Sequence, residues 1–309
     1  MLKITKWICF FVAMLLMQTI AQAQQDPQYS QYMFNTLAIN PAYAGSRDVL
    51  SVTLLHRKQW LNVDGAPMST TISADMPILN EKVGLGMLVY NDQIGEISNK
   101  AAYFSYAQRI RLTRAGTLSL GLTGGLSFFS ANLTNVSTFT PGDLVFASDV
   151  ANKPKPNIGA GIYYSTDRWY LGGSMPRVFS NKLGTSAIAK QASEFRHYFI
   201  MGGFVSHLNS IMVLKPSFIG KAVSGAPLQV DLNLNLWFYD KIAIGGSYRT
   251  GDAILGMLEL IPAQGWRLGY AYDYTISGLG NSLTSGSHEI MVRYEFASST
   301  SKILSPRYF

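Results

Sequence analysis

The chain has 309 residues, of which 48% are hydrophobic and only 14% charged, with a formal net charge of +7. Because ordinary soluble domains carry roughly 25% charged residues, this composition favours an apolar environment. A mean hydropathy of +0.12 is too low for a bundle of membrane helices, and the 28 glycines and many aromatic residues favour strands. The basic residues are spread thinly rather than gathered in a patch, which argues against nucleic acid as a partner.

The first 23 residues have the features of a secretory signal peptide. Lys3 and Lys6 precede an apolar run over 7–17, and a small-x-small motif ends at Ala23, after which we expect cleavage. The alternative is a membrane anchor, but the run is shorter than the roughly 20 residues that a spanning helix needs. The only cysteine, Cys9, lies in this segment, so the exported chain has no thiol and no disulfide.

Beyond the signal, several segments alternate between apolar and polar residues. From 228 to 236 the even positions are aliphatic, whereas the odd positions hold Gln, Asp and Asn. A period of two indicates strands, and one wholly aliphatic face suits a barrel with lipid outside and polar groups inside. A soluble β-sandwich also alternates, so the connections have to discriminate between the two folds.

The pattern predicts fourteen strands, an even number as in single-chain membrane barrels. They cover about 49–59, 68–77, 83–91, 100–112, 116–129, 157–165, 168–176, 196–206, 211–220, 228–238, 241–249, 252–261, 265–275 and 286–297. Connections after even strands are short (166–167, 239–240 and 262–264), whereas those after odd strands include 130–156, 177–195 and 276–285. The predicted fold class is therefore all-β, a transmembrane antiparallel β-barrel with long extracellular loops and short periplasmic turns.

This prediction divides the chain into four parts: a signal peptide (1–23), a periplasmic N-terminal segment (24–48), the outer-membrane barrel (49–297) and a periplasmic C-terminal tail (298–309). A barrel of this width needs its interior filled or hydrated. Segment 24–48 could therefore plug the lumen, or it could dock a periplasmic partner. Its candidate residues are Tyr32, Phe34, Asn40, Pro41 and Tyr43.

Two further sets of side chains follow from the predicted strands. Aromatic residues gather at the predicted periplasmic ends and suggest an interfacial girdle: Tyr163, Tyr164, Trp169, Tyr170, Trp237, Phe238, Tyr239, Trp266, Tyr294 and Phe296. A charge facing mid-bilayer lipid is unfavourable by about 2–4 kcal/mol, so charged strand residues should face the lumen. They are Arg109, Lys215, Asp231, Arg249, Glu259, Arg267, Asp273 and Arg293, and they either neutralise one another or hold a plug or a client segment.

No catalytic, metal or cofactor site is expected. The four histidines lack the His-x3-His spacing of a helical zinc site. Ser287 beside His288 is the one pair that would merit a test for lipid hydrolysis, although a polar residue at the mouth of the last strand is the better explanation of His288. We therefore predict that the protein is not an enzyme.

The motifs of the mature chain resemble those of a known family. They include Gln25 to Asn35, Ile39 to Ser46, Gln59-Trp60, Asp64 to Pro67, Asn91 to Gly95, Leu214 to Phe218, Gly225 to Gln229, Tyr248-Arg249, Gly251 to Ile254, Tyr270 to Thr275 and Gly286 to Met291. Together they resemble the PorP/SprF family of type IX secretion membrane proteins from Bacteroidota, over nearly the whole mature chain.

The resemblance implies an outer-membrane barrel that works with the type IX secretion and gliding machinery. Such a protein assists export of an adhesin-like client, or anchors it at the cell surface, through the client's C-terminal sorting domain. A periplasmic type IX or cell-wall-associated component is a further possible partner, and membrane lipid surrounds the barrel. The alternative function, suggested by the charged inward faces, is a passive diffusion pore for small solutes.

Two motif loops on one predicted rim supply candidate partner-binding residues: Trp60, Asp64, Gly65, Pro67, Asn91, Asp92 and Gly95. They would shape the mouth of the barrel, while the longer loops 130–156 and 177–195 would select the client. Ordinary turn chemistry is an equally good explanation for Asp64-Gly65 and Asn91-Asp92.

Overall fold

The computed structural model describes residues 29–113, 115–135, 148–181, 195–224, 226–277 and 284–296. The predictions for the signal peptide, for residues 24–28 and for the tail 298–309 therefore lie outside the described residues, as do parts of the predicted loops 130–156 and 177–195.

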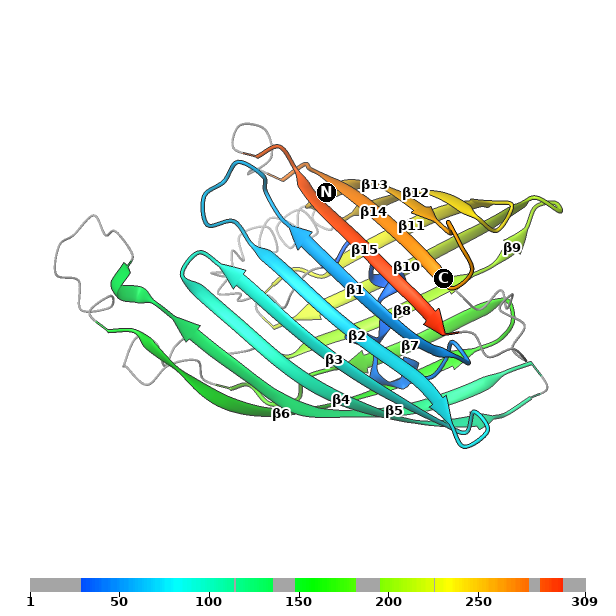
Figure 1. Ribbon diagram of the computed structural model, residues 1–309, viewed down its shortest axis with the longest axis horizontal. Coiled ribbons are helices and arrows are strands. Elements are labelled where there is room, and N and C mark those ends of the chain that lie inside the picture. Colours follow the sequence, from blue (N-terminus) through cyan, green and yellow to red (C-terminus); the bar gives the residue numbers. More distant parts are fainter. Residues whose placement is uncertain are drawn as a thin grey trace, which may run out of the picture.

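The described strands form a closed antiparallel barrel, which confirms the predicted fold class (Figure 1). The strands are β1 (Leu50–Lys58), β2 (Met68–Ile78), β3 (Val83–Ile94), β4 (Ile97–Arg111), β5 (Thr117–Ala131), β6 (Val150–Ser165), β7 (Trp169–Met175), β8 (His197–Phe204), β9 (Ser206–His207), β10 (Met212–Val223), β11 (Gln229–Phe238), β12 (Ile242–Arg249), β13 (Ala253–Leu260), β14 (Trp266–Thr275) and β15 (Ser287–Phe296). The two-residue β9 continues β8, because both pair with β10. The described residues thus form 14 strand positions, closed by β1 against β15 and by β10 against β11.

The two ends of the barrel differ in their connections. β1 begins and β15 ends at one end, which we call the turn end because the segments between strands there are short: 79–82, 112–116, 166–168, 208–211, 239–241 and 261–265. The opposite end, the loop end, carries the longer connections 59–67, 132–149, 176–196 and 276–286. No helix among the described residues is long and apolar enough to cross a bilayer.

The exterior of the barrel is apolar and the interior polar, the reverse of a soluble domain. On β11, Leu232 and Leu234 are 54% and 51% exposed, whereas Asp231 and Asn233 are buried. An aliphatic exterior around buried polar residues is the arrangement of a strand that separates lipid from a protein-filled lumen.

An aromatic layer surrounds the turn end, but it is smaller than predicted. Trp169 contacts Tyr164 with ring centroids 5.1 Å apart, and Trp266 contacts Tyr294 at 4.8 Å. The interpretation is wrong for three of the ten predicted members, Tyr163, Tyr170 and Trp237, which are buried in the lumen. Because successive strand residues face opposite sides, adjacent aromatic residues cannot both face the lipid.

The hairpin of β5 and β6 is longer than predicted, since β6 begins at Val150 rather than near residue 157 (Figure 1). Among the described strands, the first part of β6 pairs with β5 alone, and β7 joins it from Ala160 onward. Pro154 and Pro156 lie in this first part of β6, where proline is tolerated at the edge of a sheet. In the connection between β5 and β6, hydrogen bonds from the N–H and the hydroxyl of Thr134 hold the pKa of the Asp149 carboxyl below its usual value.

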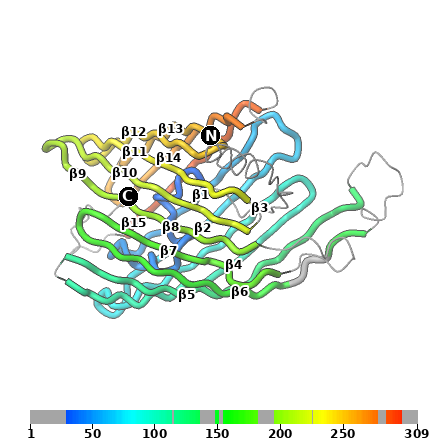
Figure 2. Tube along the Cα trace, turned by 180° about the vertical axis from the view of Figure 1, so that it is seen from behind, coloured from blue at the N-terminus to red at the C-terminus, as the bar shows by residue number. Residues whose placement is uncertain are grey.

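The core of the barrel is its own N-terminal segment. Residues 29–48, which we call the plug, lie inside the lumen as a chain of short 3-10 turns: η1 (Tyr32–Phe34), η2 (Thr36–Ala38) and η3 (Pro41–Tyr43) (Figure 2). Outside the plug, a further 3-10 turn, η4 (Leu133–Asn135), follows β5. The predicted candidates in this segment, Tyr32, Phe34, Asn40, Pro41 and Tyr43, are all buried. The described part of this segment thus lies inside the barrel.

The plug meets the wall at backbone distance where the wall carries glycine. A Cβ added to Gly84 would overlap the carbonyl of Ala44, and one added to Gly121 would overlap the backbone of Ala42. These wall positions therefore require glycine so that the plug backbone can pack against the wall.

Gly84→Val should lower the thermal stability of the folded barrel in detergent, because the added side chain displaces the plug or strains the wall. Overpacking of this kind typically costs about 1–3 kcal/mol. The measurement is the temperature at which the barrel loses its folded migration on a denaturing gel. Gly256→Val is the matched control, since a Cβ there meets nothing within 4 Å. Equal shifts in the two variants would show that the plug does not contact Gly84.

Candidate functional site

The plug runs along the lumen from the loop end to the turn end. Near its start, Ser30 contacts Glu289, which lies close to the loop end of β15. Near its finish, the N–H of Gly45 donates to the carboxylate of Asp75, at 2.9 Å, toward the turn end of β2. The plug therefore crosses most of the lumen before the chain enters β1.

Two wall carboxylates bind the start of the plug. Glu289 accepts hydrogen bonds from the backbone N–H groups of Ser30, at 2.8 Å, and Gln31, at 2.7 Å. The Ser30 hydroxyl donates to the Asp273 carboxylate at 2.8 and 2.6 Å. Arg57 lies between the two carboxylates, 2.8 Å from Asp273 and 3.5 Å from Glu289. All of these groups are buried, so the contacts are made without competition from bulk solvent.

A second arginine extends this cluster toward the neighbouring strands. Arg249 on β12 pairs with Asp231 at 2.8 Å, with Asp273 at 3.4 Å and with Asp252 at 3.5 Å. It also donates to the backbone carbonyl of Tyr29 at 3.3 Å. The same guanidinium thus neutralises wall carboxylates and holds the plug backbone.

The finish of the plug is held by ion pairs of its own. Arg47 lies 2.8 Å from Glu295 on β15, and Asp48 lies 2.9 Å from Arg109 on β4. Both pairs join the plug to strands on either side of β1. The plug is therefore fixed at both ends. The ion-pair network is the name used here for Arg57, Arg249, Asp231, Asp273 and Glu289 around its start and for Arg47, Asp48, Arg109 and Glu295 around its finish.

The remaining predicted lumen charges lie on the wall at the turn half. Arg267 pairs with Glu259 at 3.2 Å, and its guanidinium lies 5.6 Å from the ring centroid of Trp237. The ammonium group of Lys215 lies 4.5 Å from the same centroid, and Arg293 donates to the Thr53 hydroxyl at 3.0 Å. All eight predicted lumen charges are less than 10% exposed: Arg109, Lys215, Asp231, Arg249, Glu259, Arg267, Asp273 and Arg293.

Several members of the network were not predicted from the sequence. Arg57, Glu289 and Glu295 all lie on inward faces that a strict period of two identifies, because Glu289 and Glu295 share the face of Arg293. Arg47 and Asp48 lie in the plug, where no strand period applies, so the sequence carried no such signal for them.

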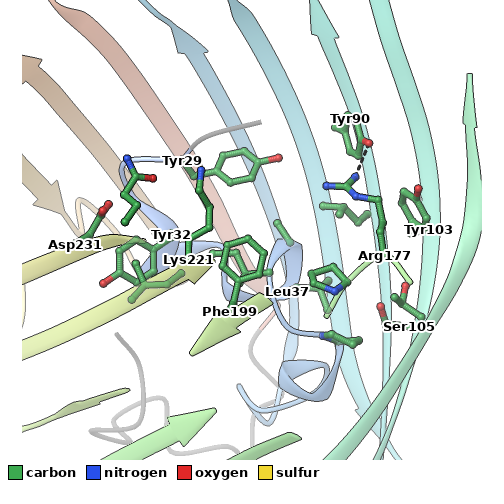
Figure 3. Close-up of a pocket in the computed structure, with 18 of the residues that line it drawn as sticks. Tyr29, Tyr32, Leu37, Tyr90, Tyr103, Ser105, Arg177, Phe199, Lys221 and Asp231 are labelled. Carbon is green, nitrogen blue, oxygen red and sulfur yellow. Dashed lines mark hydrogen bonds between the residues drawn. The ribbon is translucent and has the colours of Figure 1, made fainter. Parts of the chain in front are cut away.

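A cavity lies between the plug and the loop-end half of the wall (Figure 3). Plug residues Tyr29, Tyr32 and Leu37 line one side. The wall contributes aromatic and charged groups, among them Tyr90, Phe199, Lys221 and Asp231. The plug and the wall therefore share the lining of this cavity.

Arg177, just after β7, bridges this part of the lumen. Its guanidinium donates to the Tyr90 hydroxyl on β3 at 2.7 Å and lies 5.9 Å from that ring's centroid (Figure 3). Tyr90 in turn stacks on Tyr103 of β4, with centroids 6.4 Å apart. The cavity thus has a cationic group held among aromatic rings.

Five of the seven predicted rim residues occupy two contacting connections: Trp60, Asp64, Gly65, Pro67 and Gly95. The N–H of Gly95 donates to the Gly65 carbonyl at 2.9 Å, so the β1–β2 connection touches the β3–β4 turn. Asp64 is exposed on this rim, Trp60 is half-buried with its N–H 3.1 Å from the Ser287 hydroxyl, and Pro67 is buried.

The other two rim candidates belong to a strand, not to a loop. Asn91 and Asp92 lie in β3 and pair with Lys100 and Asn99 of β4; a two-residue turn at Gly95 and Glu96 joins the two strands. The Asp92 carboxylate faces the lumen and accepts a hydrogen bond from the Ser69 hydroxyl. The sequence suggested a longer loop here because Asn91 and Asp92 are polar. In the structure, these polar residues continue β3 beyond its apolar part.

Ser287 and His288 do not form a nucleophile and base pair. Ser287 faces the lumen, whereas His288, its neighbour on the strand, faces outward and lies 2.7 Å from the Tyr270 hydroxyl. The described residues include no group of three or more potential metal ligands.

Comparison with known proteins decides the family. The model of the type IX secretion system membrane protein PorP/SprF matches residues 21–294, nearly the whole chain. The chain belongs to the PorP/SprF family. No curated protein sequence matches it significantly. With its closed barrel and lipid-facing exterior, this PorP/SprF protein is an outer-membrane component of type IX secretion, and it works with other parts of that machinery.

Solved structures similar to this PorP/SprF protein are outer-membrane barrels. The toluene transporter TbuX of Ralstonia pickettii shares 10% identity at a TM-score of 0.49, covering 85% of this chain and 93% of its own. The CymD monoaromatic hydrocarbon channel shares 11% identity at 0.48, covering 87% and 94%. The KdgM porin shares 10% identity at 0.41, covering 80% and 99%.

Arg57→Met should destabilise the folded PorP/SprF barrel by about 3–5 kcal/mol, because it leaves buried carboxylates without their partner. Adding Glu289→Gln to that variant should restore part of the stability. Denaturant unfolding followed by tryptophan fluorescence measures both effects. Glu81→Gln, at an exposed pair 3.9 Å from Arg111, is the control and should change little. A loss for Arg57→Met no larger than this control's would contradict a structural role for the network.

Proposed function

We propose that this barrel anchors a large client protein, or assists its export, by binding the client's C-terminal sorting domain at the loop end. Family membership supports work in type IX secretion. The rule that outer-membrane barrels keep short turns in the periplasm supports an extracellular loop end. The observation that carries the proposal is the lumen, which is filled by the plug and so favours action at the rim.

The proposal differs from the diffusion-pore alternative in what the lumen does. Passive channels need a continuous aqueous path, whereas the plug here has residues with almost no exposed surface, such as Ala42 and Asn40, pressed against the wall. Buried ion pairs at both ends make its removal costly. The structure therefore supports an anchor more than a pore.

The loop end supplies the recognition surface in this proposal. The contacting loops around Gly65 and Gly95 shape one side of the mouth, and the connections after β5 and β7 supply variable area on a rigid wall. At the opposite end, we propose that a periplasmic type IX or cell-wall-associated component docks. Export of the chain would begin with cleavage after Ala23.

Purification of the tagged barrel from outer membranes should recover a large adhesin-like protein with a C-terminal sorting domain. Mass spectrometry identifies it, and a strain whose client lacks that domain is the control. Repeated recovery of the barrel without any such client would contradict the proposal.

Planar-bilayer recordings should separate the anchor from the pore. The intact protein should pass little current, whereas a variant lacking 29–47 should open stable channels because the lumen is no longer filled. Equal conductance in the two proteins would favour the diffusion pore.

A further inference from the structure

The outer wall of the barrel carries a polar patch at the loop end, where β1 meets β15 (Figure 1). Lys58 ends β1 with an exposed side chain and pairs in register with His288 of β15, which pairs in turn with Tyr272 of β14. Directly opposed residues of an antiparallel sheet have Cβ atoms about 4.5–5.5 Å apart, so these side chains form one surface. We call these three residues, with His56 and Tyr270 two positions further along β1 and β14, the outer patch.

The residues of the outer patch face away from the lumen. Their neighbours along the strands, such as Arg57 and Glu289, are buried inside the barrel, and successive strand residues face opposite sides. The outer patch is therefore separated by the wall from the ion-pair network, and a ligand reaches it from outside the barrel.

Hydrogen bonds hold both imidazoles of the outer patch. The Nδ1 atom of His288 lies 2.7 Å from the Tyr270 hydroxyl, and its ring packs edge-on against Tyr272 with centroids 5.1 Å apart. The Nδ1 atom of His56 lies 2.9 Å from the Thr70 hydroxyl. These contacts occupy Nδ1 and leave Nε2 of each ring as the nitrogen that donates to a ligand.

The charge of the outer patch is positive. On the outward faces of the described strands, Lys58 and Lys100 are the only lysine or arginine residues, and no Asp or Glu is found there. Within the same described residues, Lys58 makes no ion pair. Lys100 has no histidine beside it, because its partners across the strands are Asn91 and Phe128. Lys58 is thus the one outward lysine with an imidazole directly opposite.

The surface next to the outer patch is aliphatic. Toward the turn end, β1 and β15 present Leu54, which is 42% exposed, and Ile290, which is 53% exposed. A ligand that covers both surfaces needs an anionic head and apolar chains. Lipids have this chemistry and reach the outer wall by diffusing within the membrane, whereas basic side chains near a membrane surface attract anionic headgroups.

We propose that the outer patch binds the phosphate of lipid A, the phosphorylated glycolipid of the outer leaflet, with its acyl chains on Leu54 and Ile290. Lys58 pairs with the phosphate, and Nε2 of His288 donates a hydrogen bond to it. The inference rests on the extracellular loop end of the proposed function, because that orientation brings the outer patch to the outer leaflet. The bound lipid spans β1 and β15, the first and last strands of the barrel.

The first test uses the full-length barrel in detergent, with native mass spectrometry to count bound lipid. Lipid A should form at least fivefold more complex than the same lipid after removal of its phosphates. Equal amounts of the two complexes, or no complex with either, overturn the proposal. Inorganic phosphate in large excess should leave lipid A bound, and complete displacement would identify a free-phosphate site instead of a lipid site.

The second test assigns the phosphate to its residues. Lys58→Met, at an exposed position, should reduce binding of lipid A to the level of the dephosphorylated lipid. His288→Phe, which keeps an aromatic ring against Tyr272, should reduce it at least threefold. Lys100→Met is the matched control and should bind lipid A as the unaltered barrel does. Equal losses for the two lysine variants would show unspecific attraction to interfacial cations and overturn the proposal, as would unchanged binding by Lys58→Met.

These measurements are independent of the client. If the phosphate preference is absent while the barrel still recovers its client from outer membranes, the lipid site fails and anchoring stands. If the preference is present but no client is recovered, the proposed function fails and the lipid site stands.

Discussion

Charge neutralisation inside the barrel is the constraint on which the rest of the structure depends. A wide membrane barrel with a lipid-facing exterior has to place its charges in the lumen, where each needs a partner. Here Arg57 and Arg249 pair with wall carboxylates, and those carboxylates also accept hydrogen bonds from Ser30 and Gln31 of the plug. The charges around the start of the plug are thus neutralised by one another and hydrogen-bonded by the N-terminal segment.

That shared satisfaction explains how the fold leads to function. Because the plug completes the network, it occupies the lumen between the wall strands, and a cavity lined by plug and wall lies toward the loop end. A sealed barrel with a cavity and long loops at one end suits holding another protein better than passing solutes. Gly84 and Gly121 are part of the same arrangement, because the absence of a Cβ lets the plug backbone approach the wall there.

The sequence predicted the strands closely because lipid on one side and polar groups on the other impose a strict period of two. The predictions of buried charge on β11, β12 and β14 follow directly from that period. The prediction that Tyr163 and Tyr170 face the lipid is wrong because it ignored this period. A residue next to a lipid-facing residue on a strand faces the lumen. The plug has no such period, so Arg47 and Asp48 gave no signal, and the cavity depends on side chains that only the closed fold brings together, such as Arg177 and Tyr90.

The central claim is that the plug occupies the lumen of the native protein, and thiol labelling tests it most directly. The only native cysteine, Cys9, lies in the expected signal peptide, so Ala42→Cys and Asp64→Cys introduce single reporters at a fully buried and an exposed position. In opened outer-membrane vesicles, a membrane-impermeant maleimide should label residue 64 rapidly and residue 42 only after denaturation. Rapid labelling at residue 42 in the native membrane would contradict the account.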